Sequence, residues 1–542
     1  LSFVESNVIR PLILLLSTLS ISGCNTTKDT GEDTTPAMAF GNMGSLSGES
    51  GQGSFRFGAS TAATQIEDQN THTDWHYWTL PTEDGGAGFS TPIGEAVQGY
   101  SKAIDDIQLM KEMNLDAYRF SLSWSRIEPS RDTIDEEALQ HYGDFLDALR
   151  ANNIEPMVTV HHFANPFWTY NFIDGCPDTG WSDDNLCGWA DPEGAEQIIE
   201  EIEEYGAMIA ARYGDRVDEW CTLNEPVNYL LASYGMGVFP PGESNLLGNF
   251  DRLVVAIRNM MEAHSRLYDA IKANDTIDAD GDGVAAHVGL SLSIADWVPV
   301  RDGELSDHPE DVAAANNLRY IYHHVFPESF LNGTFDNDFD GTADEEHPTW
   351  QNKLDWLGLQ YYFRAGVTGK LQLLPVVNGM ICLQGFEDLS GGSCLNIPDQ
   401  TKWVPSMGYE FYEPGFGALL EEYATTYPSL PLVVTESGIA TEVGERRAEN
   451  IVRSLEQIAN AQAKGADIRG YYHWSLTDNF EWAEGYEPQF GLYEVDRNNF
   501  ERSPTLGATL LGDIANQREL SSEMRDTYGG TGPMTPEEHH VE

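Results

Sequence analysis

Pro431-Leu432-Val433-Val434-Thr435-Glu436-Ser437-Gly438 is the stretch that decides the fold. Its apolar part is continuous rather than alternating, which is typical of a strand buried on both faces of a parallel sheet. The glycine ends the strand and leaves Glu436 at its carboxyl end. The sequence therefore predicts an inner strand that carries a carboxylate at its end.

A second stretch, Trp220-Cys221-Thr222-Leu223-Asn224-Glu225-Pro226, has the same order of residue types. A short apolar strand again leads to a glutamate at its carboxyl end, here Glu225. In a parallel barrel, the carboxyl ends of the strands form one mouth, where the chemistry takes place. Glu225 and Glu436 are therefore candidates for a general acid/base and nucleophile pair.

The rest of the chain alternates short apolar segments with amphipathic ones, which predicts a single (β/α)8 TIM barrel in the α/β class. The predicted strands are residues 55–59, 117–124, 156–163, 219–224, 287–294, 356–362, 432–435 and 469–476. Helical patterns lie between them, among them residues 103–113, 136–150, 196–212, 253–273 and 445–463.

The charge of the chain excludes several classes of partner. The 542 residues include 30 Lys and Arg against 87 Asp and Glu, for a net charge of −57. Such a field repels nucleic acids, anionic membrane surfaces and anionic substrates. It is typical of a protein that stays soluble in a salty medium, where its self-repulsion is screened.

The first residues predict export. Arg10 precedes the short apolar run 11–21, and Ile21-Ser22-Gly23-Cys24 resembles a bacterial lipoprotein box. A lipoprotein would carry its lipid on Cys24. Asn25 would favour the outer membrane, at the periplasmic or the cell-surface side. The alternative is an ordinary signal peptide. The predicted parts are a signal peptide (1–23), a flexible tether rich in Gly, Ser and Thr (24–52), the barrel (53–517) and an acidic, polar tail (518–542).

The remaining cysteines form two local pairs and one single residue. Cys176 and Cys187 flank a short polar loop, as do Cys382 and Cys394, and each pair is a candidate disulfide in an oxidising compartment. Cys221 lies inside a predicted buried strand, which indicates a free core thiol.

The residues at the strand ends resemble those of glycoside hydrolase family 1, the retaining β-glucosidases and β-galactosidases, from about residue 55 to about residue 511. The matching motifs are Gln65-Ile66-Glu67, Tyr118-Arg119-Phe120-Ser121, Trp124-Ser125-Arg126, residues 162–166, Thr222-Leu223-Asn224-Glu225-Pro226, Trp474-Ser475-Leu476, Asp478-Asn479-Phe480-Glu481-Trp482 and Phe490-Gly491-Leu492. This resemblance implies a retaining exo-β-glycosidase on a TIM barrel.

The resemblance also implies a role for each site residue. Glu225 would be the general acid/base and Glu436 the nucleophile, with Arg119 and Tyr362 keeping the nucleophile ionised. Sugar hydroxyls would be bound by Gln65, His162, Asn224, Tyr362, Glu481 and Trp482, with Trp474 as the stacking surface. For His162 and Trp474 the alternative is core packing.

Physical chemistry agrees with these roles, because a retaining mechanism needs one ionised and one protonated carboxyl group about 5–5.5 Å apart. A cation such as Arg119 lowers the pKa of Glu436, while burial raises the pKa of Glu225. No cofactor is expected for catalysis. The sequence departs from the family pattern at Asp68, Ser437, Gln360 and residues 164–166, and residues 484–489 hold no cation that would bind a phosphorylated sugar.

Two acidic loops suit a hard cation. The first holds Asp278, Asp280 and Asp282, and the second holds Asp336, Asp338, Asp340 and Asp344. Alternating Asp with a trailing Gly favours calcium, but neither loop has a Glu at the twelfth position of a complete EF-hand. Each loop is either a structural calcium site or a solvated acidic turn, on the face opposite the mouth.

The sequence as a whole predicts a β-glucosidase that hydrolyses short β-glucosides and whose partner is a small carbohydrate. Within the family, the alternatives are a β-galactosidase, a β-fucosidase or a transglycosylase, which differ only in the sugar or the acceptor. The alternative of another class is a non-catalytic sugar-binding surface protein, which would be expected to lack one of Glu225 and Glu436. Membrane contact is expected only through the N-terminal lipid, and the oligomeric state is not predicted.

Overall fold

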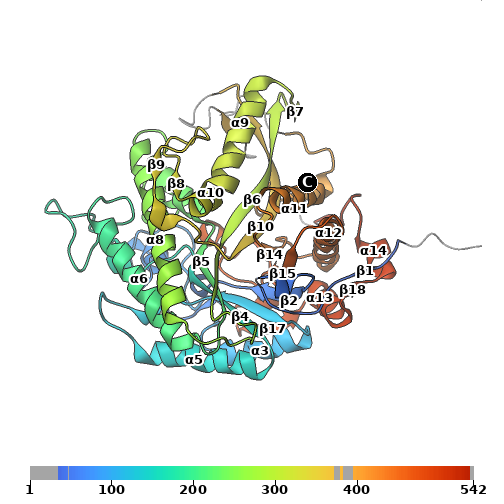
Figure 1. The fold of residues 1–542 in the computed structure, drawn as a ribbon, viewed down its shortest axis with the longest axis horizontal. Helices are drawn as coiled ribbons and strands as arrows, with labels where there is room; N and C mark the ends of the chain where they lie inside the picture. The colour runs from blue at the N-terminus through green and yellow to red at the C-terminus, as the bar shows by residue number, and fades with distance from the viewer. Residues whose placement is uncertain (1–34, 47, 372–378, 383–394, 538–542) are drawn as a thin grey trace, which may run out of the picture.

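The computed structural model describes residues 35–46, 48–371, 379–382 and 395–537. Eight parallel strands close into one barrel, with each strand paired to the next along the chain and the last paired to the first (Figure 1). The strands are β2 (Arg56–Ser60), β3 (Ala117–Ser121), β4 (Glu155–His161), β5 (Glu219–Asn224), β6 (His287–Arg301), β10 (Trp356–Thr368), β14 (Leu432–Ser437) and β15 (Ile468–Trp474). The predicted (β/α)8 barrel is confirmed.

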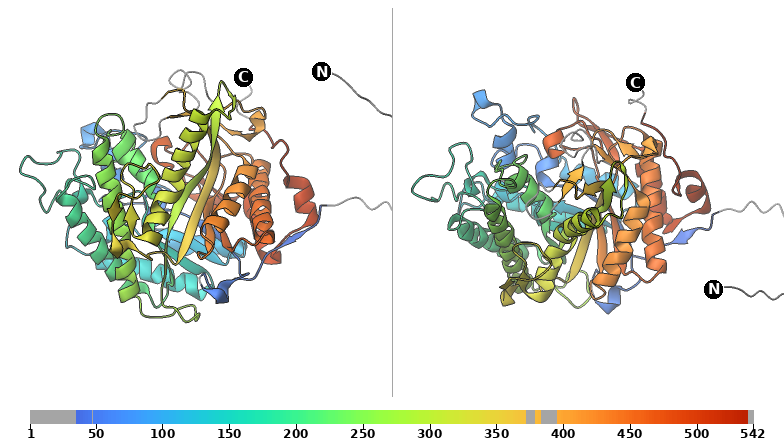
Figure 2. Two further views of the ribbon diagram at one scale, coloured as in Figure 1. Left: turned by 45° about the horizontal axis from the view of Figure 1, so that its top comes forward. Right: turned by 90° about the horizontal axis from the view of Figure 1, so that it is seen from above.

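Helices surround the barrel, as the two views in Figure 2 show. α5 (Glu136–Ala151) and α8 (Phe250–Asn274) each bury one apolar face, as their 3.6-residue pattern requires, whereas residues 446–456 of α12 (Gly444–Ala463) are all buried. The larger helices are α3 (Ala103–Glu112), α5 (Glu136–Ala151), α6 (Gly194–Tyr213), α8 (Phe250–Asn274), α9 (Pro309–Arg319), α10 (Val325–Asn332), α11 (Glu413–Thr426), α12 (Gly444–Ala463) and α13 (Leu506–Gln517). None of the helices in the described ranges is long and apolar enough to cross a membrane.

Shorter elements complete the chain. They are α1 (Ala63–Ile66), α2 (Asp74–Thr79), α4 (Trp124–Ile127), α7 (Pro226–Leu230), α14 (Ser522–Tyr528), β1 (Met38–Ala39), β7 (Glu304–Leu305), β8 (Thr334–Phe335), β9 (Glu345–Glu346), β11 (Met380–Cys382), β12 (Trp403–Val404), β13 (Tyr409–Glu410), β16 (Tyr493–Asp496), β17 (Glu501–Pro504) and β18 (Glu519–Leu520).

Two barrel strands continue well past the rim. β6 and β10 pair in parallel as far as Pro299 of β6 and Val367 of β10. The sequence predicted shorter strands, which end at residue 294 in β6 and at residue 362 in β10. Figure 1 shows this two-stranded extension beside α9. Trp297, Val367 and Leu318 form a small apolar cluster there, separate from the main core. The extension therefore stands above the barrel next to the mouth.

Both ends of the described chain differ from the expected tether and tail. Met38–Ala39 pairs with Glu519–Leu520 as a small antiparallel sheet, and Phe40 and Leu46 are buried. Residues 522–528 form α14, and residues 529–537 then run along the barrel surface, where Arg453 donates hydrogen bonds to backbone carbonyls of residues 532 and 533. The expectation of a loose chain is wrong for these residues, because composition does not reveal contacts between distant segments.

The predicted disulfides have different outcomes. Cys176 and Cys187 are joined, with Cα atoms 5.1 Å apart. Cys221 is buried and free, as expected. The predicted Cys382–Cys394 bridge and the lipid site Cys24 fall outside the residues that can be described, so both stay predictions.

Candidate active site

Glu225 and Glu436 occupy the carboxyl ends of two barrel strands. Glu436 is the fifth residue of β14, and Glu225 follows β5 directly. Glu225 has a φ of 40°, a left-handed conformation that is strained for a residue with a side chain. Its backbone N–H donates to the carbonyl of Ser291 at 2.8 Å, which fixes the turn. Both side chains are buried at the barrel mouth.

Glu436 is held by one cation and one hydroxyl group. Arg119 Nη1 donates to Oε1 of Glu436 at 2.6 Å, and the hydroxyl of Tyr362 donates to Oε2 at 2.8 Å. Arg119 is fully buried on β3, so its charge acts in a low-dielectric environment. Burial raises the pKa of Glu436, but these two donors oppose that rise. Glu436 is therefore the ionised member of the pair.

Glu225 forms no ion pair with any Lys or Arg in the described part of the chain. Burial, followed by the nearby charge of Glu436, raises the pKa of Glu225 to about 8. The amide of Asn228 donates to its Oε2 at 2.8 Å and partly opposes the rise. Because its neighbour carries the negative charge, Glu225 holds a proton at neutral pH. The two carboxyl groups are thus arranged as one acid and one base.

Asn224 connects the two halves of the site. Its Oδ1 accepts hydrogen bonds from Arg119 Nη2 at 2.6 Å and from Gln360 Nε2 at 2.8 Å. Its Nδ2 lies 3.1 Å from Nε2 of His162. Burial keeps the pKa of His162 well below its ordinary value, so that its ring is neutral. The network fixes Asn224 beside both glutamates.

Glu481 and its two neighbours form the opposite wall of the site. Trp474 Nε1 donates to Oε1 of Glu481 at 3.0 Å, and Gln65 Nε2 donates to Oε2 at 3.3 Å. Trp482 follows Glu481, and its ring lies 6.0 Å from that of His162. The structure therefore brings together all seven predicted sugar-binding residues, although they come from six separate segments of the chain.

Several buried polar atoms of this wall have no partner among the described residues. They include Oε1 of Gln65 and Nδ1 of His162. A buried polar group without a hydrogen bond is costly, and one at the mouth of a barrel is typical of a site that a polar ligand completes. Neutral donors and acceptors of this type suit the hydroxyl groups of a sugar ring.

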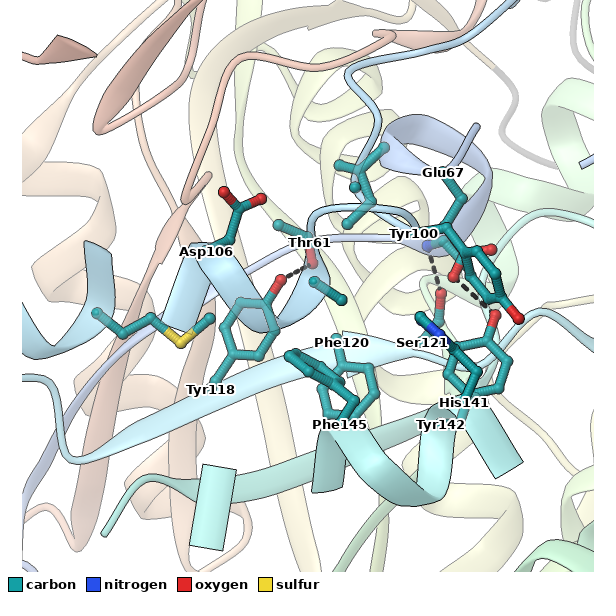
Figure 3. A pocket seen from close by; sticks show the side chains of 15 residues that line it. Thr61, Glu67, Tyr100, Asp106, Tyr118, Phe120, Ser121, His141, Tyr142 and Phe145 are labelled. Carbon is teal, nitrogen blue, oxygen red and sulfur yellow. Dashed lines mark hydrogen bonds between the residues drawn. The ribbon is translucent and has the colours of Figure 1, made fainter. Parts of the chain in front are cut away.

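Hydrogen bonds to neighbouring residues hold α1, the helix that carries Gln65. A small cavity of about 30 Å³ lies beside α1 and is lined by side chains of β3 and α5; Figure 3 shows these side chains. There the hydroxyl of Tyr142 donates to Glu67 at 2.6 Å, and the backbone N–H of Ala63 donates to Ser121 at 2.8 Å. Arg126 holds the second oxygen of Glu67 at 2.9 Å. These contacts hold α1 in place and so direct Gln65 toward Glu481.

The two acidic loops lie away from this site, at the opposite end of the barrel. Asp278, Asp280 and Asp282 are in the turn between α8 and β6, and Asp336, Asp338, Asp340 and Asp344 are between β8 and β9. In the second loop, both carboxylate oxygens of Asp336 accept backbone N–H groups, from Asp340 and Gly341. Neither loop contributes to the mouth.

The sequence did not single out Asn228 or Gln360 as functional. Asn228 lies three residues after Glu225, on α7, the short helix that Glu225 precedes. That spacing was the signal available for Asn228. Gln360 was noted only as a departure from the family pattern, and its contact with Asn224 spans 136 residues. Only the folded barrel reveals such a contact.

Asn228→Ala is expected to move the alkaline limb of the kcat/KM pH profile to higher pH. The lost N–H donor stabilises the ionised form of Glu225, so without it the pKa rises, by up to about one unit. The protonated acid then persists to higher pH, and activity falls later. Asn228→Asp, which adds a negative charge, should shift the limb at least as far. An alkaline limb that does not move in either variant would contradict this role.

Comparisons with known proteins agree with the geometry. The model of glycosyl hydrolase family 1 matches residues 50–520. A β-galactosidase of Pyrococcus woesei is 29% identical over 478 residues, which cover 80% of this chain and 89% of that protein. Beta-glucosidase 40 of Arabidopsis thaliana is 29% identical over 443 residues, covering 76% and 81%.

The solved structure of a β-glycosidase from Pyrococcus horikoshii is similar over 90% of this chain and 100% of its own, with a TM-score of 0.72 and 27% identity. The match to the family model covers most of the chain, and it includes every strand end described above. The chain therefore belongs to glycosyl hydrolase family 1.

Proposed function

We propose that this glycoside hydrolase is a retaining exo-β-glycosidase that acts on short β-glucosides, with Glu436 as nucleophile and Glu225 as general acid/base. The observation that carries the proposal is the unequal environment of the two glutamates. Glu436 has a buried guanidinium and a phenol as donors, whereas Glu225 has a neutral amide and a pKa raised to about 8. One carboxylate can attack while the other carboxyl group donates a proton.

In the first step, Glu436 attacks the anomeric carbon of the sugar. The bond from this carbon to the glycosidic oxygen breaks, and the proton of Glu225 moves to the leaving oxygen. In the second step, Glu225 takes a proton from water, the water oxygen bonds to the anomeric carbon, and Glu436 leaves. The sugar is released with its original configuration, and both glutamates return to their starting states.

Sugar binding is assigned to the neutral wall opposite the two glutamates. Glu481 is fixed by Trp474 and Gln65, and burial raises its pKa to about 8. Its oxygens and the unpartnered Oε1 of Gln65 are suited to neighbouring hydroxyl groups of one sugar. This wall accepts either configuration at the fourth carbon, and the relatives' names include both β-glucosidase and β-galactosidase. Because the wall suits both sugars, the preference for glucose is itself a proposal, which rates on different glycosides test.

Initial rates on aryl β-glucoside, β-galactoside and β-fucoside are the test of this preference. The glucoside is expected to have the highest kcat/KM, within roughly 10- to 200-fold of the others. The galactoside differs from it in the orientation of one hydroxyl group, and the fucoside also lacks the sixth hydroxyl. Glu481→Gln should lower kcat/KM on the glucoside, where an NH2 group replaces one carboxyl oxygen facing the sugar hydroxyls, more than on the fucoside, which lacks the sixth hydroxyl. A galactoside that is hydrolysed faster would assign the enzyme to the other sugar, and no hydrolysis of any of the three would refute the proposed activity.

A further inference from the structure

Three carboxylates meet at the end of the barrel opposite the active site. One oxygen from each of Asp218, Asp278 and Asp280 lies within 4.8 Å of the other two. Asp278 and Asp280 belong to the first acidic loop and are exposed, whereas Asp218 immediately precedes β5 and is fully buried. The sequence pointed to the loop but not to Asp218, which is 60 residues away.

The side chain of Asp218 points into the loop, and only one of its two carboxylate oxygens has a hydrogen-bond partner. Its Oδ1 accepts the backbone N–H of Ala279 at 2.9 Å, while its buried Oδ2 has no hydrogen-bond partner in the described part of the chain. A buried carboxylate oxygen of this kind needs either a proton or a cation.

The neighbouring cations are already paired with other carboxylates. Arg56 is paired with Glu219, and Arg150 with Glu155. Among the described residues, no Lys or Arg forms an ion pair with Asp218, Asp278 or Asp280. These three side chains therefore form a negative site that is open to solvent through the exposed loop.

Asp282, the third aspartate of the first loop, has partners of its own. Asp282 Oδ2 lies 2.7 Å from Nε2 of His287 and accepts the hydroxyl of Ser45 at 2.5 Å. In the second loop, Glu345 is held by Arg258 Nε at 2.9 Å and by Asn337 at 2.8 Å. The backbone N–H groups of Gly281 and Gly283 bind the two oxygens of Asp278, much as the second loop binds Asp336. The first loop is the stronger candidate for a cation because of the unpartnered Oδ2 of Asp218.

We propose that Asp218, Asp278 and Asp280 bind one calcium ion. Calcium prefers oxygen ligands and accepts six to eight of them in flexible geometry, so that waters and loop carbonyls can complete a site that is exposed on one side. Magnesium demands a nearly ideal octahedron and is a poorer match. The ion would join the loop between α8 and β6 to the first residue before β5. Its role is structural, because the active site is at the opposite end of the barrel.

The test compares melting temperatures of the full chain after dialysis against EGTA, with no addition, with CaCl2 or with MgCl2. Asp218→Asn keeps the shape and the acceptor for Ala279 but removes the charge, and Asp280→Asn is a second variant. Asp340→Asn, in the second loop, is the matched control. Calorimetric titration with CaCl2 gives the stoichiometry, and aryl glucoside hydrolysis shows that each variant is folded.

Calcium is expected to raise the melting temperature of the wild type by a few degrees, and magnesium by less. The wild type and Asp340→Asn should bind one equivalent at this site, while Asp218→Asn and Asp280→Asn should lose at least about tenfold in affinity. In EGTA, Asp218→Asn should melt close to the wild type, because the amide has the same shape and keeps the acceptor for the N–H of Ala279. A purely structural Asp218 would instead lower the melting temperature with and without calcium. The proposal is overturned if the wild type does not respond to calcium, or if Asp218→Asn responds as the wild type does.

Discussion

Glu436→Ala is expected to lower kcat on aryl β-glucosides by at least about 10⁴-fold, the largest loss that any single substitution in the chain should cause. The substitution removes the group that forms the covalent bond to the sugar, and Arg119 and Tyr362 lose their shared partner. Glu436→Gln should be nearly as inactive, because the amide keeps the shape but does not attack. The measurement is kcat and KM for purified, folded variants.

A small anion distinguishes a missing nucleophile from a damaged site. Azide should enter the space left in Glu436→Ala, attack the anomeric carbon from the same face and restore turnover, giving an α-glycosyl azide by a single inversion. Glu219→Gln is the matched control, since Glu219 is also buried and paired with an arginine, Arg56, but at the opposite end of the barrel. It should change stability with little change in kcat. Activity of Glu436→Ala within tenfold of the wild type would refute its role.

Glu225→Ala is expected to have an effect that depends on the leaving group. For a substrate with a poor leaving group, the loss in kcat/KM should be about 10²- to 10⁴-fold, because the leaving oxygen is no longer protonated. For a dinitrophenyl glucoside, which needs no acid, the first step should be nearly unaffected, and the glycosyl-enzyme should accumulate because water is no longer activated.

The pH profile provides a second and independent readout for Glu225. In the wild type, kcat/KM should fall as pH rises through the pKa of about 8, where the acid loses its proton. Glu225→Ala should lack this alkaline limb. Glu225→Gln tests the same point with an isosteric side chain. Equal losses on good and poor leaving groups, with the alkaline limb unchanged, would contradict the assignment.

The barrel strands could be predicted because their burial on two faces leaves continuous apolar runs, as in residues 432–434. The extension of β6 and β10 could not, since charged residues such as Asp296 and Arg364 interrupt the apolar pattern beyond residues 294 and 362, although residues 365–368 of β10 are buried. The pairing of β1 with β18 joins segments about 480 residues apart, and neither carries a local strand signal. Tertiary contact, rather than local preference, forms these elements.

The site was predictable where a residue lies at a strand end within a long motif, as with Asn224 and Glu225. The structure adds the connections between motifs, for example from Arg119 to both Glu436 and Asn224. It also adds Asn228, which no motif contained, and Asp218, whose unpaired oxygen becomes apparent only when the loop is folded against it. Contacts of this kind depend on three-dimensional proximity, which spacing along the chain does not encode.

The most direct test of the central claim is the configuration of the first product, followed by proton NMR from the start of aryl β-glucoside hydrolysis. Two displacements, one by Glu436 and one by water, predict that the β-anomer appears first and that the α-anomer follows only by mutarotation. Direct attack by water would give the α-anomer first. That result would show that Glu436 forms no covalent bond with the sugar and would contradict the assignment of the two glutamates.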